Sequence, residues 1–147
     1  MNIVNFQIIQ FIIMAIIGIS FNPMNMLLYR TTDFYFSLTN LYGGILMASN
    51  MMWAHELVHY FSMGYFNINV FTIGIILSLF VTFLLLRHQS LVSDRQWIRR
   101  MIGHHSTALT TSHNILNKTE DRRIKNLARG IIETQEREIT FMKKFLQ

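Results

Sequence analysis

Residues 68–86 read INVFTIGIILSLFVTFLLL, a run of 19 residues without a charged side chain that ends at Arg87. An α-helix rises about 1.5 Å per residue, so a run of this length crosses most of the hydrocarbon core of a bilayer, which is about 30 Å thick. The run therefore predicts a membrane-spanning helix over residues 68–87.

Two further apolar runs precede this one. Residues 6–29 carry no charge, although Pro23 is expected to kink or end the helix. Residues 34–54 also carry no charge, and we expect a helix over about 36–60. The sequence thus predicts a membrane domain, residues 1–89, with three transmembrane helices at about 6–29, 36–60 and 68–87.

Charge is concentrated in the last part of the chain. Charged residues make up 14% of the sequence, against about 25% in soluble domains. Of the 13 Lys and Arg residues, only Arg30 precedes position 87. With three spans, Arg30 and the C-terminal domain lie on one side of the membrane, and the positive-inside rule predicts that this is the cytoplasmic or interior side. The absence of cysteine excludes disulfides and thiolate metal sites.

Residues 90–147 have the mixed charge and apolar periodicity of two amphipathic helices. The pattern breaks at 118–121, where Thr119 or Asp121 is a candidate cap for the second helix. We therefore expect an all-α protein, with an antiparallel helical hairpin after the membrane domain.

Polar groups interrupt the apolar face of each hairpin helix: His104 and His105 beside Met101 in the first helix, and Gln135 and Glu138 beside Met142 in the second. Antiparallel pairing about a turn near 119–120 brings the two sets to nearly the same height. Buried imidazoles and carboxylates are costly unless they are paired or bind a metal. Two interpretations stay open, namely a satisfied core network without a ligand and a metal site.

The hairpin resembles the family called domain of unknown function 305. The family pattern, M-I-P-H-H followed later by I-x-x-x-Q-x-x-E-I-x-x-M, is matched here by MIGHH at 101–105 and IIETQEREITFM at 131–142. The Met-rich second span, Asn67-Ile68-Asn69 and the third span also resemble a membrane-anchored branch of that family.

The resemblance implies a ferritin-like module, half of a four-helix bundle, related to copper-binding proteins of the CopM type. It implies copper ligands at Met101, His104, His105 and Met142. The helix pairing places Gln135 and Glu138 next to this set, where they are expected to orient the ligands. Gly103 stands where the family has proline. Glycine does not force the kink that proline does, so the geometry of the site is expected to differ.

His55-Glu56-Leu57-Val58-His59 matches the H-E-x-x-H motif of zinc metalloproteases, in which the histidines bind zinc and the glutamate activates water. A third protein ligand is missing, because the third span contains no Asp, Glu or His. Ionisable residues within a span often face other helices and carry function. A broader set on the same helical face, Met52, His55, Glu56, His59 and Met63, is thus a possible second metal or proton site, or an inert hydrated cluster.

The leading hypothesis is a multi-pass membrane protein whose helical hairpin binds a soft metal without catalysis, with copper preferred and zinc as the alternative. Thioethers select Cu(I), and imidazoles accept copper or zinc. Two alternatives remain: a structural membrane component, cellular or viral, without metal, and an intramembrane zinc protease. Two helices bury little apolar area, so we also expect a homo-oligomer. Nucleic-acid binding is not expected, because the basic residues of the hairpin alternate with acidic ones.

Overall fold

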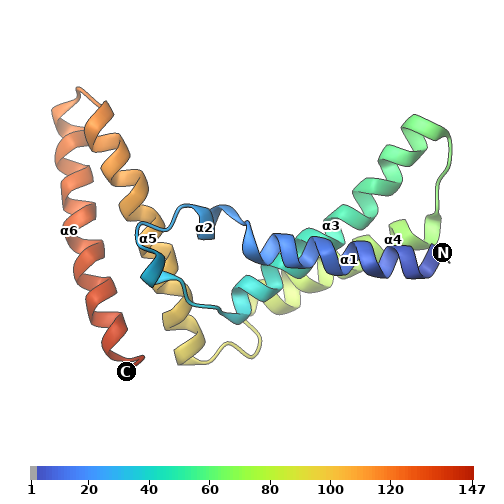
Figure 1. Cartoon of the computed structure of the whole chain (residues 1–147), viewed down its shortest axis with the longest axis horizontal. Coiled ribbons are helices and arrows are strands. Elements are labelled where there is room, and N and C mark those ends of the chain that lie inside the picture. The colour runs from blue at the N-terminus through green and yellow to red at the C-terminus, as the bar shows by residue number, and fades with distance from the viewer. Residues whose placement is uncertain (1–2) are drawn as a thin grey trace. The chain divides into compact units, whose positions relative to one another are not determined.

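The computed structural model describes residues 3–147, and these form helices with no strand among them (Figure 1). The predicted all-α class is therefore confirmed. The chain divides into two compact units. The apolar unit contains the chain up to Phe21 together with Leu38–Leu91, and the hairpin unit contains Asn22–Ser37 together with Val92–Gln147.

The apolar unit is built around one central helix. Helix α3, Leu38–Met63, contacts α1, Ile3–Ser20, and α4, Ile68–Phe80. Helix α4 continues into the π-helical segment η2, Val81–Arg87, which also contacts α3. Helix α3 thus has a neighbour on two of its faces.

Glycines let the neighbours of α3 approach its backbone. A Cβ atom on Gly44 would lie 2.8 Å from the carbonyl oxygen of Ala15 in α1. A Cβ atom on Gly74 of α4 would lie 2.9 Å from the backbone nitrogen of Trp53 in α3. Small residues at such crossings are typical of membrane helix pairs. In lipid the hydrophobic effect contributes little to helix association, so the pairs gain stability from close packing.

Two helices of the described chain, rather than the predicted three, are long and apolar enough to cross a membrane: Asn5–Met26 and Ile68–Arg87. Helix α3 has 26 residues, which is sufficient length, but its polar side chains lower its hydropathy too far. Asn40, Ser49 and Glu56 of α3 are buried, so these groups face protein. The first span is also interrupted, because α1 ends at Ser20 and a short helix, α2, begins at Pro23, as that proline suggested.

The hairpin unit contains the expected antiparallel pair, α5, Asp94–Lys118, and α6, Arg122–Lys144 (Figure 1). Asp121 caps α6, because its side chain accepts a hydrogen bond from the backbone N–H of Arg123 at 2.8 Å. The apolar core of this pair consists of Ile102, Leu109, Ile139 and Met142.

The segment Asn22–Ser37, called the strap below, packs with the hairpin rather than with the helices that flank it in sequence. It contains α2, Pro23–Met26, and the 3₁₀ turn η1, Thr31–Asp33, which both contact α5. The strap lies within residues 1–89, which the sequence analysis assigned to the membrane domain.

Candidate metal-binding sites

His105 is held between the two helices of the hairpin. Its Nδ1 lies 2.8 Å from the carbonyl oxygen of Met101, one turn earlier in α5. Its Nε2 lies 2.9 Å from the Oε2 atom of Glu138 on α6. Each ring nitrogen thus has an oxygen partner within hydrogen-bond distance. His105 and Glu138 thus form a satisfied pair across the helix interface.

A hollow of about 520 Å³ opens beside this pair, between α5 and α6. Four of the residues predicted from the sequence line it: Met101, His105, Glu138 and Met142. The rest of its wall consists of Asp94 and of apolar side chains, among them Trp97 and Phe141. The hollow is therefore lined by two thioethers, one imidazole and two carboxylates, those of Glu138 and Asp94.

The other two predicted residues lie outside this hollow. His104 is exposed, and its ring centroid is 5.9 Å from that of His105. Partial burial, and then the charges of His105 and Arg100, hold the pKa of His104 below its usual value. Gln135 is half-buried on α6. The adjacent histidines consequently do not converge, because one residue along a helix turns the side chain by about 100°.

The strap is fixed to the hairpin by a buried acid that the sequence analysis did not single out. Asp33 is completely buried, and its Oδ1 lies 2.5 Å from the Nζ atom of Lys143. Ser106 donates a hydrogen bond to its Oδ2 at 2.7 Å. Arg30 and Glu136 add an exposed ion pair at 2.7 Å. The sequence does contain a hint of this role, because Asp33 is one of only two acidic residues before position 87.

The second predicted cluster lies on α3. Each of His55, Glu56 and His59 offers one ligand atom, and these atoms all lie within 4.8 Å of one another. Among the described residues, this is the group of three His, Asp or Glu side chains that are close enough to hold one metal ion. The hairpin residues do not form such a group. Met63, at the end of α3, is 76% exposed, and Met52 is half-buried. The structure thus gathers three of the five residues predicted for this site.

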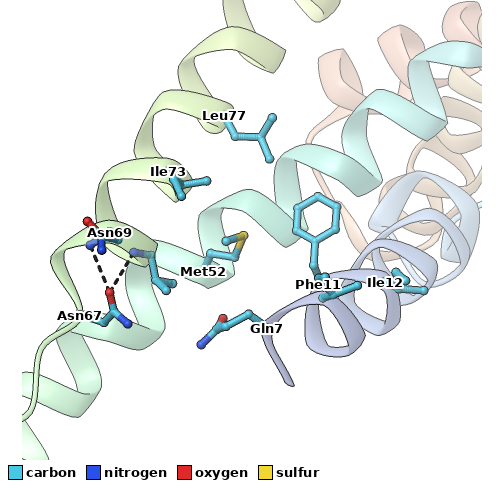
Figure 2. A pocket seen from close by; sticks show the side chains of 10 residues that line it. Gln7, Phe11, Ile12, Met52, Asn67, Asn69, Ile73 and Leu77 are labelled. Atoms are coloured by element: carbon cyan, nitrogen blue, oxygen red, sulfur yellow. Dashed lines mark hydrogen bonds between the residues drawn. The ribbon is translucent and has the colours of Figure 1, made fainter. Parts of the chain in front are cut away.

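A second hollow, of about 490 Å³, lies beside this part of α3 (Figure 2). Gln7 and Phe11 of α1, Met52 of α3 and Asn67 at the start of α4 line it, together with apolar residues. The side chain of Asn67 caps α4 by accepting hydrogen bonds from the backbone N–H groups of Asn69 and Val70 at 3.1 and 3.3 Å. The backbone N–H of Asn67 donates to Glu56, so a hydrogen bond links the α3 cluster to the lining of this hollow.

Comparison with known proteins adds two findings. Residues 85–146 match the family described as Domain of unknown function (DUF305). The chain is also 32% identical over 143 residues to "Uncharacterized protein L153" of Acanthamoeba polyphaga mimivirus, and the match covers 97% of this chain and 92% of that protein. No solved structure matches.

Proposed function

This chain belongs to the DUF305 family, and we propose that it is a membrane-anchored member whose hairpin unit binds a soft metal ion without catalysing a reaction. The metal proposed first is copper, because the hairpin resembles copper-binding relatives of the CopM type. The observation that carries the proposal is the hollow in which Met101, His105, Glu138 and Met142 meet.

The side chains around the hollow have the chemistry of a copper site. Thioether and imidazole ligands suit Cu(I), whereas carboxylate ligands favour harder ions. Met142 is 7% exposed and Met101 is half-buried, so both sulfur atoms are sheltered from bulk water. We therefore assign the ligand roles to Met101, His105 and Met142, with His104 and Gln135 outside the site.

Glu138 has a different role in this proposal. A metal ion at Nε2 of His105 replaces the proton that this nitrogen donates to Glu138, so binding releases a proton. Glu138 then either turns aside or becomes a further oxygen ligand. When no metal is bound, the same carboxylate keeps the imidazole satisfied and in place.

Membrane anchoring is supported by the two apolar helices and by the glycine crossings of the apolar unit. We propose that α3 enters the membrane between them, with its polar groups covered by α1 and α4. The basic hairpin unit is expected on the interior side. Exposed apolar side chains on the hairpin, such as Leu127 at 64%, support a homodimer in which two hairpins complete a four-helix bundle.

The test is a Cu(I) titration of the full chain, purified in mild detergent without metal, against a competing chelator. We expect one copper to be lost from His105→Ala, while His104→Ala, its exposed neighbour, keeps it. Met101→Leu should weaken Cu(I) binding by at least about 10-fold and change zinc binding little. Unchanged copper stoichiometry in His105→Ala would show that His105 belongs to a core network, and would favour the structural alternative.

A further inference from the structure

The α3 cluster combines two histidines at the spacing that places both on one helix face. His55 and His59 are four residues apart, and their ring centroids lie 4.0 Å from each other. Nδ1 of His55 is buried and has no hydrogen-bond partner. A buried polar atom without a partner costs free energy, which a bound ion would recover.

Glu56 adds a buried carboxylate to the pair. It is 1% exposed, and its Oε2 accepts a hydrogen bond from the backbone N–H of Asn67 at 2.9 Å. Among the described residues, no lysine or arginine forms an ion pair with Glu56. The hydrogen bond fixes the carboxyl group through Oε2, and no cationic side chain of the described chain pairs with it.

We propose that His55, Glu56 and His59 bind a divalent transition-metal ion, zinc first, inside the apolar unit. Two imidazoles and one carboxylate are a common zinc ligand set, with metal–ligand distances of about 2.0–2.2 Å. Ligand atoms at a tetrahedral zinc ion then lie about 3.4 Å apart, so modest side-chain rotations from the present separations suffice. Glu56 is a ligand in this proposal, not the base that activates water.

The bound ion would join the C-terminal half of α3 to the start of α4, because the N–H of Asn67 holds the carboxylate that binds the metal. Such a contact between a metal ligand and a backbone donor orients the ligand and raises affinity. This site involves no residue of the hairpin hollow, so its existence does not depend on the copper proposal.

The test is a zinc titration of the full chain in mild detergent, with a chromophoric zinc chelator as competitor. The wild type should bind one zinc at this site and should unfold at a higher temperature when zinc is present. His55→Ala and His59→Ala should each weaken zinc binding at least about 10-fold and remove that thermal shift. The matched control is His88→Ala, an exposed histidine of the same unit, which should change neither.

A second measurement uses the wild type, so that it tests the site even where a histidine variant fails to fold. Co²⁺ added to the wild type should give the visible absorption of a tetrahedral nitrogen and oxygen site, and zinc should displace it. The double variant Met101→Leu with His105→Ala should keep this absorption, which separates the site from the copper site. Wild-type protein that binds neither ion, or His55→Ala with unchanged zinc affinity, would overturn the proposal.

Discussion

The two histidine pairs of this chain lie on long helices, but they present their rings differently. His55 and His59 are four residues apart, and their ring centroids are separated by 4.0 Å. His104 and His105 are adjacent, and the corresponding separation is 5.9 Å. A step of four residues returns to the same helix face, whereas a step of one does not. The motif with adjacent histidines therefore offers one ligand to the hollow, and the spaced pair offers two to one point.

The two buried acids extend this comparison. Asp33 in the hairpin unit has Lys143 as its counter-charge, while Glu56 in the apolar unit has a backbone N–H and two histidines nearby. The hairpin unit thus balances its buried charge internally. In the apolar unit, no described lysine or arginine pairs with Glu56, which is why the zinc proposal belongs to that unit.

The largest expected effect follows from removing the internal counter-charge. Lys143→Met leaves Asp33 buried and unpaired, and such changes cost about 3–5 kcal/mol, with the lower end expected because Lys143 is 29% exposed. The strap should open more often, which hydrogen exchange of residues 22–37 measures. Lys144→Met, at the exposed neighbouring position, is the control and should leave exchange unchanged. Equal exchange in both variants would mean that the ion pair does not hold the strap.

A smaller effect is expected from the packing of the apolar unit, which depends on backbone proximity. In Gly44→Ala the new methyl group would clash with Cγ1 of Ile19 and would lie 2.8 Å from the carbonyl oxygen of Ala15, so α1 must shift. Overpacking of this kind costs about 1–3 kcal/mol. Gly43→Ala is the matched control, because nothing lies within 4 Å of its Cβ position. In detergent, the unfolding temperature of Gly44→Ala should be lower than those of the wild type and Gly43→Ala. The opposite order would contradict the close crossing of α1 and α3.

Much of the fold follows from local sequence signals. Apolar periodicity predicts α5 and α6, Asp121 predicts the cap of α6, and Pro23 marks the break after α1. These features depend on residues within a few positions of each other, so the sequence carries them directly.

The remaining features depend on contacts that are distant in sequence. Asp33 and Lys143 are 110 residues apart, and no local pattern indicates that they meet. Helix α3 does not meet the hydropathy criterion for a span, because the stretch was judged by its lack of charge although uncharged polar residues such as Asn40 and Ser49 lie within it. In the hairpin, the helix pairing predicted that Glu138 lies at nearly the same height as the histidines of the facing helix. That it pairs with His105 depends on the directions of the side chains, which the pairing does not give.

The smallest predicted effect tests charge pairing where water has full access. Asp121 accepts hydrogen bonds from the guanidinium and backbone N–H of Arg123, and these bonds, the side-chain bond first, hold the pKa of Asp121 below its usual value. Between that lowered pKa and the unfolded value of about 3.9, the unfolded chain binds a proton that the folded chain does not. The stabilisation is therefore complete above about pH 4 and is lost as the pH falls through the folded pKa. Asp121→Asn keeps an acceptor for the helix cap but cannot titrate, so its stability should fall less between pH 5 and pH 3.

The measurement for this variant is the free energy of unfolding at the two pH values, followed by circular dichroism. Glu133→Gln removes an exposed acid elsewhere on α6 and should keep the wild-type pH dependence. The same pH dependence in Asp121→Asn and the wild type would show that the Asp121–Arg123 pair contributes nothing at the hairpin turn. The effect should also weaken as salt is added, because exposed charges are screened, whereas the buried Asp33–Lys143 pair should respond little. That contrast in salt dependence separates the exposed pair of the turn from the buried pair that holds the strap.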